Sequence, residues 1–201
     1  MDLHHKQTFF NELASRWDQF PSPPDAPAKV ARFVARCLGD SARRVLDVGC
    51  GTGILLPHIR DSAAAPRDIV ELDLAEAMLR ENRKKPGAAR AVHVCAAVQR
   101  PPFRPGAFDR ILCFNALPHL NPIDDSLRQM LDCLCSEGLL SIGHLMESAE
   151  LNQFHSNVGG AVSGDRLPTA RDLVAQLTAM GAEVIFAEEE AGWYFVQVRR
   201  P

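Results

Sequence analysis

A run of glycines after a short apolar segment is the sharpest chemical feature of the sequence. Asp47 is followed by Gly49, Gly51 and Gly53, and residues 45–48 have the composition of a buried strand. Glycines at such a turn let the backbone bend tightly and let a ligand approach it closely. A helix that begins there offers free backbone N–H groups. The pattern predicts a ligand-binding turn, with a plain tight turn as the alternative.

A second acidic residue favours the ligand-binding interpretation. Asp73 ends the apolar run at 70–72, about twenty residues after the last glycine, which is the separation typical of nucleotide-binding turns. An acid at this place accepts hydrogen bonds from both ribose hydroxyls of an adenosine-containing ligand. Capping the next helix is the ordinary alternative role for such an aspartate.

Polar residues follow the next two predicted strands. Asn115 and His119 come after the run at 108–114, His144 ends the run at 139–144, and His155 lies in the helix beyond it. We expect the three histidines to converge on a bound acceptor, because parallel strands end at one edge of a sheet. They would act there as proton acceptors, or as ligands of a metal ion or of a metal-containing substrate. A structural role is the alternative for each, and no local spacing marks a resident metal site.

A loop after these elements carries a further candidate pair. Asp165 and Arg166 precede Leu167 and Pro168, and the loop is expected to cover the acceptor. Arg166 would meet an anionic group of the acceptor, or else form an ordinary surface salt bridge.

The elements that must position these residues alternate along the chain. Strands are expected at 43–48, 68–73, 91–96, 108–114 and 139–144, with helices at 53–60, after 73 to Lys85, at 123–135, near 147–156 and at 169–180. Two last runs, 183–187 and 193–198, are expected to form an antiparallel hairpin. The order predicts a doubly wound α/β fold with a seven-stranded, mostly parallel sheet and a C-terminal antiparallel hairpin.

Length and composition restrict the function classes. The 201 residues, 46% of them hydrophobic, suit one domain, in which the Pro-rich stretch 21–27 separates an N-terminal helix from a core over 28–201. A net charge of −3 does not favour nucleic acid as a partner. The sequence shows no signal peptide and no run of about 18 apolar residues that would span a membrane. We therefore expect a cytoplasmic protein with reduced cysteines, as a monomer or homodimer.

Two segments resemble a known family. Residues 47–53 read DVGCGTG and residues 73–79 read DLAEAML, which are similar to motif I and the acidic motif of the class I S-adenosylmethionine-dependent methyltransferases. Later segments of the same family are also similar to parts of this chain, namely residues 102–103, residues 106–109 and the EGLL at 137–140. The similarity is closest to the branch with ubiquinone and menaquinone C-methyltransferases, which also ends in an antiparallel hairpin.

The resemblance implies a Rossmann-like enzyme that uses S-adenosyl-L-methionine to methylate a small-molecule acceptor. Asp47 and the three glycines would surround the methionine part of the cofactor, Asp73 would hold the ribose, and Leu74 and Met78 would flank the adenine. The family often has an aspartate for the adenine amine where this chain has Ala97. The implied cofactor site comprises Trp17, Asp47, Gly49, Gly51, Gly53, Asp73, Leu74, Met78, Ala97, Val98 and Asn115.

The N-terminal helix also resembles a part of this family. Residues 9–18 are similar to a lid segment over the cofactor, and Trp17 would lie against the ligand. Simple packing of an apolar stripe on the domain is the alternative, and it is compatible with a lid.

Two other functions share part of these features. A nicotinamide-dependent oxidoreductase also has glycines after its first strand, but it uses G-x-G-x-x-G, whereas this chain has G-x-G-x-G. A non-catalytic S-adenosylmethionine-binding module is the other alternative, and the polar residues of the acceptor side argue against it. The sequence does not identify the acceptor.

Overall fold

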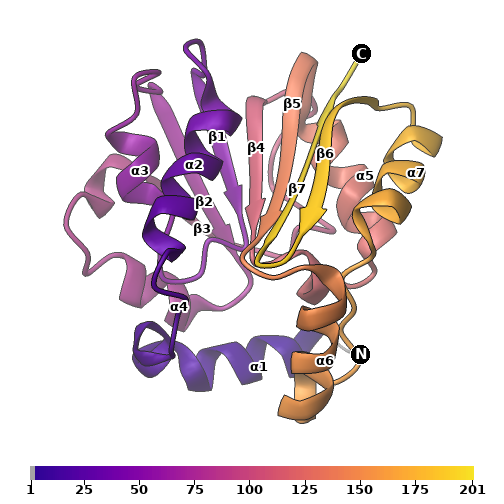
Figure 1. The fold of residues 1–201 in the computed structure, drawn as a ribbon. Coiled ribbons are helices and arrows are strands. Elements are labelled where there is room, and N and C mark those ends of the chain that lie inside the picture. Colours follow the sequence, from indigo (N-terminus) through magenta and orange to yellow (C-terminus); the bar gives the residue numbers. More distant parts are fainter. Residues whose placement is uncertain (1–2) are drawn as a thin grey trace.

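Seven strands form one sheet in the computed structural model, which describes residues 3–201 (Figure 1). The strands are β1 (Arg44–Val48), β2 (Asp68–Asp73), β3 (Val92–Cys95), β4 (Phe108–Phe114), β5 (Leu134–His144), β6 (Glu183–Glu190) and β7 (Trp193–Arg199). Their order is β3-β2-β1-β4-β5-β7-β6, and β7 is antiparallel to both of its neighbours while the other pairs are parallel. The predicted fold class is therefore confirmed.

Helices cover both faces of the sheet. On one face, α2 (Ala26–Leu38) and α3 (Leu56–Arg60) contribute Phe33 and Ile59 to a buried cluster with β1. On the other face, α5 (Ile123–Cys133) and α7 (Ala170–Ala179) contribute Leu127 and Leu173 to a second cluster with β4 and β5. The strands β1, β4 and β7 are mostly buried between these layers, whereas β3 and β6 at the two edges of the sheet are partly or largely exposed.

The remaining helices lie around the carboxyl ends of the parallel strands. In the lower part of Figure 1, α1 (Leu3–Leu13) crosses below the strand ends, with α6 (Ser148–Val158) beside it. Helix α1 contacts α4 (Glu76–Asn82), which follows β2. Short 3₁₀ turns complete this end: η1 (Ala14–Gln19), η2 (Ala88–Arg90), η3 (Leu117–His119) and η4 (Gly160–Val162). The ligand edge of the sheet is thus covered by the N-terminal segment.

The last helix is bounded by the signals in its sequence. The hydroxyl of Thr169 accepts a hydrogen bond from the backbone of Asp172, at 3.1 Å, and so caps the first turn of α7. Gly181 follows the helix with a φ of 90°, which places it in the left-handed region as expected.

Other boundaries differ from the prediction. Helix α2 was not predicted, and it begins inside the Pro-rich stretch, with Pro27 in its first turn. The helix expected over 53–60 begins only at Leu56, because the glycine turn extends further. Strand β5 starts at Leu134, directly after α5, so it takes in residues 134–135, which were expected to end the helix, and residues 136–138, which were expected to form a loop. None of the helices within residues 3–201 is both long and apolar enough to cross a membrane.

Candidate functional site

The glycines that follow β1 have two different environments. A Cβ on Gly49 would lie 2.5 Å from the Cβ of Ala116, and a Cβ on Gly53 would lie 2.5 Å from Oδ1 of Asn82. A Cβ on Gly51 would meet no atom within 4 Å. All three have positive φ values, which favour glycine. Gly49 and Gly53 are therefore needed for packing, whereas Gly51 borders open space at the edge where a ligand is expected.

Asp73 is bonded directly to this turn. One carboxylate oxygen accepts from the amide of Gly51 at 2.8 Å, and the other accepts from the amide of Ala75 at 2.8 Å. Both interpretations of Asp73 thus have a physical basis, because the carboxylate organises the start of α4 and also fixes the turn. Each oxygen keeps a second lone pair with which it can accept a further donor.

Asp47 is a buried carboxylate without a donor. It is 1% exposed, and neither side-chain oxygen has a hydrogen-bond partner within residues 3–201. Burial raises the pKa of Asp47 well above its ordinary value, and the nearby charges of Glu71 and Asp73 raise it further. A buried carboxylate in this state is costly unless a cation or donor reaches it. The ammonium group of S-adenosylmethionine is a group of that kind, so the residues present fit this cofactor.

A second buried carboxylate lies beside Asp47 in the sheet. Glu71 is 0% exposed and accepts from Nδ2 of Asn82 at 2.9 Å. Burial raises the pKa of Glu71 to about 7, while the hydrogen bond from Asn82 and the charge of Lys85 oppose the shift. The sequence analysis did not single out Glu71, because it occurs inside an apolar strand pattern.

The N-terminal segment forms hydrogen bonds across the edge of the sheet where the cofactor is expected. Gln7 donates to the carbonyl of Leu74 at 3.0 Å, and Asn11 accepts from the amide of Ala77 at 2.9 Å. Further along, Asp18 accepts from the hydroxyl of Thr52 in the glycine turn at 2.5 Å. These contacts place α1 and η1 over the motifs, as a lid would be.

The predicted adenine side is partly packed core. Met78 is 2% exposed and clusters with Ala14 and Ala75, and Trp17 packs against the same cluster. Val98 is 4% exposed and belongs to the main core. Ala97, partly buried, follows β3 at the same edge. The roles of these residues, and that of Leu74, in cofactor binding stay predictions.

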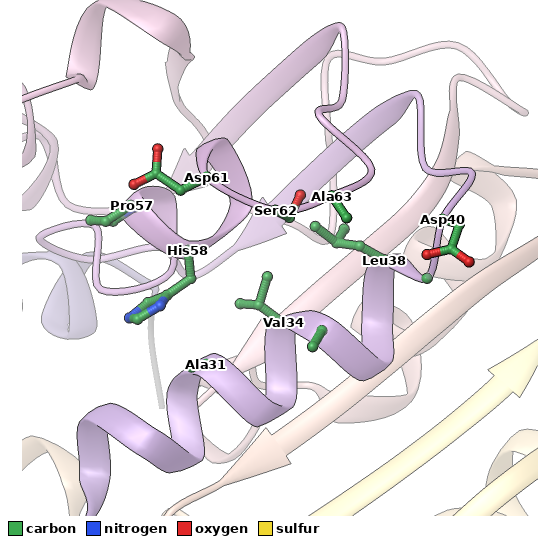
Figure 2. A pocket seen from close by; sticks show the side chains of 11 residues that line it. Ala31, Val34, Leu38, Asp40, Pro57, His58, Asp61, Ser62 and Ala63 are labelled. Atoms are coloured by element: carbon green, nitrogen blue, oxygen red, sulfur yellow. The ribbon is translucent and has the colours of Figure 1, made fainter.

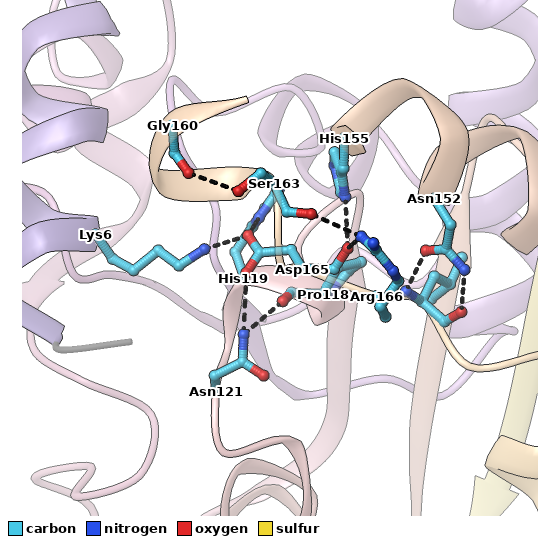
Figure 3. A network of polar contacts seen from close by, with 11 residues as sticks. Lys6, Pro118, His119, Asn121, Asn152, His155, Gly160, Ser163, Asp165 and Arg166 are labelled. Carbon is cyan, nitrogen blue, oxygen red and sulfur yellow. Dashed lines mark hydrogen bonds and ion pairs between the residues drawn. The ribbon is translucent and has the colours of Figure 1, made fainter. Parts of the chain in front are cut away.

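The acceptor side holds a dense polar network (Figure 3). Asp165, 2% exposed, is at its centre: Oδ2 lies 2.6 Å from Nδ1 of His119, and Oδ1 accepts from Asn121 at 3.1 Å. Lys6 of α1, also 2% exposed, forms an ion pair with the same carboxylate. His155 lies next to His119, with ring centroids 4.9 Å apart, and its Nδ1 is 3.3 Å from the backbone carbonyl of Asp165.

His144 ends β5 inside the protein. It is 2% exposed, and its Nε2 has no hydrogen-bond partner in the part of the chain that the structure describes. Burial lowers the pKa of His144 to about 3, and the nearby charges of His119 and His155 contribute. The structure thus brings His119 and His155 together and places His144 close enough to interact electrostatically with both. Their catalytic roles stay predictions.

We predict that His144 makes the protein less stable in mild acid. The unfolded chain binds a proton at a pKa of about 6.5, whereas the folded protein does so only at about 3. The stability from keeping this ring neutral is present above pH 6.5 and is lost as the pH falls. Between pH 7.5 and pH 5, urea unfolding should show a loss of about 2 kcal/mol that His144→Leu lacks. An equal loss in the wild type and the variant would contradict this account.

Two other predicted residues have structural contacts. Asn115 has a φ of 52°, and its side chain accepts from the amide of Leu145 at 3.1 Å, so it links the ends of β4 and β5. Arg166 is exposed and donates to the backbone carbonyls of Ser163 and Asp165. The surface salt bridge considered for Arg166 is absent among the described residues, since its guanidinium donates to backbone carbonyls, and the Asp165 carboxylate pairs with Lys6.

Sequence reasoning missed Lys6, Asn121 and the central place of Asp165. Lys6 and Asp165 are separated by 159 positions, so no spacing connects them. One signal was present, since Lys6 lies four residues before Phe10 on the apolar face of a predicted helix. A lysine on that face predicts a buried acidic partner, because an unpaired buried charge is too costly.

A separate cavity of about 420 Å³ lies between α2 and α3. Figure 2 shows Val34, Leu38 and His58 on its wall, with Asp40 and Asp61 at its rim. No residue of the predicted cofactor or acceptor site lines it.

Comparison with known proteins gives the family of this site. The family described as "Methyltransferase domain" matches residues 46–142, which run from β1 through most of β5. A ubiquinone biosynthesis O-methyltransferase of Pseudomonas aeruginosa is 28% identical over 124 residues, which are 58% of this chain and 52% of that protein. Residues 46–142 form a methyltransferase domain of the class I S-adenosylmethionine-dependent type. The resemblance inferred from the glycine turn and the acidic motif is thereby confirmed, and S-adenosylmethionine is the cofactor of this methyltransferase domain.

Solved structures share the fold of the methyltransferase domain. The magnesium protoporphyrin IX methyltransferase of Synechocystis, with bound SAH, superposes with a TM-score of 0.74 at 15% identity, over 100% of both chains. A [4+2]-cyclase superposes with a TM-score of 0.70 at 19% identity, over 86% of this chain and 81% of that one. The chain spans about half the length of the curated relatives it matches.

Asp73→Ala is expected to weaken S-adenosylmethionine binding at least about a hundredfold. The substitution removes two hydrogen bonds to a charged acceptor, each worth about 1.5–3 kcal/mol. Titration calorimetry with the cofactor measures the effect, and Glu76→Ala, an exposed acid in the next helix, is the matched control. Unchanged affinity of the Asp73 variant would remove Asp73 from the site.

Proposed function

We propose that this methyltransferase domain transfers a methyl group from S-adenosylmethionine to an oxygen of a small-molecule acceptor bound at the carboxyl edge of the sheet. The observation that carries the proposal is the glycine turn, with Asp73 bonded to the Gly51 amide and the orphaned Asp47 behind it. The polar network around His119 lies at the same edge. This juxtaposition supports a cofactor on one side and a reacting acceptor on the other.

The cofactor would supply an electrophilic methyl group on a sulfonium. Asp47 would neutralise its ammonium, Asp73 would accept from its ribose, and the lid residues Gln7 and Asn11 would hold α1 over the site. The chain's own part in catalysis is then to align the acceptor with the methyl group and to exclude water, because an in-line displacement depends mainly on orientation.

Oxygen as the acceptor atom is supported by the relatives. Several curated relatives are named ubiquinone biosynthesis O-methyltransferase, including those of Pseudomonas aeruginosa and Aromatoleum aromaticum. An O–H acceptor loses its proton when it is methylated, and His119 and His155 place imidazoles at the acceptor side to receive it.

The setting of the protein follows from the same features. All six cysteines are free within the described residues, which supports a reducing compartment such as the cytoplasm. The net charge of −3 supports a small molecule rather than nucleic acid as the substrate. A monomer or homodimer is compatible with a site that one chain supplies.

Binding followed by product detection tests the proposal. Calorimetry should show binding of S-adenosylmethionine and no binding of NAD. Mass spectrometry should then show release of S-adenosylhomocysteine when a panel of phenols and other hydroxyl compounds is supplied. Binding of NAD in place of S-adenosylmethionine would favour the oxidoreductase. Cofactor binding with no product from any acceptor would favour the non-catalytic module, or a reaction without methyl transfer such as that of the cyclase with this fold.

A further inference from the structure

We propose that Asp165 is a positioning residue that holds His119 in the tautomer able to accept the acceptor's proton, and that Lys6 joins this pair when α1 lies over the site. The inference rests on the proposed function and deepens it. It assigns to the site an acceptor that carries an ionisable hydroxyl, such as a phenol or an enol.

A hydrogen bond joins His119 to Asp165. The carboxylate is ionised, because its hydrogen bonds with His119 and Lys6 lower the pKa of Asp165 against the opposing effect of burial. An ionised carboxylate only accepts hydrogen bonds. Nδ1 of His119, 2.6 Å from Oδ2, must therefore carry the proton.

The other ring nitrogen of His119, Nε2, can accept a proton. With its proton on Nδ1, the neutral ring of His119 has a lone pair on Nε2, and the hydrogen bond that the ring forms within residues 3–201 uses Nδ1 rather than Nε2. The side chain is 17% exposed, so the ring is neither sealed in the core nor free in solvent. It is held on two sides, by the ring of Phe10 at 5.1 Å and by that of His155 at 4.9 Å between centroids.

His119 lies near the edge where the cofactor is expected. Burial raises the pKa of Asp73, the predicted ribose contact, and the imidazolium form of His119 lies near enough to oppose that rise. Phe10 contacts both His119 and Trp17, and Trp17 packs on the cluster around Met78. The imidazole is thus joined through the lid to the predicted adenine side.

The lid helix α1 contributes Lys6 to this group. Lys6 lies on α1, and its side chain is 3% exposed where it meets Asp165, which Figure 3 shows between Lys6 and His119. Two other side-chain hydrogen bonds of α1, from Gln7 and to Asn11, join it to the backbone of Leu74 and Ala77 after β2. Withdrawal of α1 would remove Lys6 from Asp165, so the closed lid and the complete proton-accepting group form together.

The proposed step balances in atoms and charge. As an oxygen lone pair of the acceptor forms a bond to the methyl carbon, the sulfur–carbon bond breaks and its electron pair stays on sulfur. The O–H proton passes to Nε2 of His119, where the imidazolium is stabilised by Asp165. The proton then leaves to solvent. Asn121, which donates to Oδ1 at 3.1 Å, keeps the carboxylate in place during the step.

The test replaces the buried pair and reads the tautomer of His119. Asp165→Leu alone would leave Lys6 as an unpaired buried charge, so the main variant is Lys6→Met with Asp165→Leu. With ¹⁵N-labelled histidine, NMR at a pH where the ring is neutral should show His119 protonated on Nδ1 in the wild type. The Nε2-protonated form should dominate in the double variant. His119→Gln assigns the signal.

A matched pair serves as the control. Glu81 and Lys84 form an exposed ion pair on α4 and the turn after it, and Glu81→Leu with Lys84→Met should leave the His119 signal unchanged. A wild-type ring protonated on Nε2, or a tautomer that stays the same in the double variant, would overturn the positioning role.

A kinetic measurement separates this inference from the proposed function. With 4-nitrophenol as the acceptor probe, the double variant should lose at least about tenfold in kcat while its calorimetric affinity for S-adenosylmethionine stays within twofold. An unchanged kcat would overturn the proton-accepting role. If the wild type binds no S-adenosylmethionine, the proposed function fails, yet the tautomer still decides the role of Asp165. If it binds the cofactor but methylates no 4-nitrophenol, the assignment to a phenolic acceptor is overturned.

Discussion

Gly51→Val is expected to abolish measurable binding of S-adenosylmethionine while the protein stays folded. The substituted Cβ would meet no protein atom within 4 Å, so the side chain would enter the open space beside Asp73 where the cofactor is expected. The loss should exceed about a hundredfold, since the cofactor and the side chain would occupy the same volume. Titration calorimetry measures the affinity, and circular dichroism checks the fold.

Gly39→Val is the control for backbone strain. Gly39 has the same φ of 54° as Gly51, and a Cβ there also meets nothing within 4 Å, but it lies between α2 and the start of β1, away from the carboxyl ends of the strands. Both variants should lose similar stability, about 1–3 kcal/mol, because valine is strained at positive φ. Retained affinity in the Gly51 variant would show that the cofactor does not use this side of the turn.

Asp165→Leu is expected to destabilise the protein by about 3–5 kcal/mol, and Lys6→Met in the same chain should restore most of the loss. The single change leaves the Lys6 ammonium buried without a counter-charge, whereas the double change replaces the pair with apolar groups of similar size. Urea unfolding at pH 7.5 measures both values.

The exposed ion pair between Lys84 and Glu81 again provides the comparison. Its side chains are 64% and 26% exposed, and pairs of this kind contribute about 0–1 kcal/mol. If Asp165→Leu costs no more than Glu81→Leu, then Lys6 and Asp165 are not a buried pair in solution.

The sequence predicts best where the physical cause is local. The strands at 68–73 and 108–114 were predicted with the bounds that the structure has, because each has apolar residues at its centre and turn-forming residues nearby. The cap at Thr169 and the stop at Gly181 depend on side-chain and φ preferences that one or two residues decide. The glycine turn and Asp73 belong to the same class, and comparison with known proteins confirmed the family they indicated.

The errors arise where a local pattern has two interpretations or where distant parts of the chain decide the outcome. The missed helix α2 has an amphipathic pattern, with Val30, Phe33, Val34 and Cys37 buried, but the proline stretch before it suggested a linker. The helix expected at 53 begins only at Leu56, and Gly53 before it lies close to Asn82 of another element. The acceptor network depends on Lys6 and Asp165, which only the tertiary fold brings together.

The carboxylates beneath the glycine turn favour the binding of positively charged ligands at this site. S-adenosylmethionine carries a net positive charge, whereas its demethylated product is neutral overall. Asp47, Glu71 and Asp73 interact electrostatically with one another, so their negative charge favours the reactant over the product. Because the pKa of Glu71 is raised to about 7 by burial, that charge grows as the pH rises through neutrality. We therefore expect product inhibition to ease between pH 6 and pH 8, as the ratio of the two dissociation constants widens.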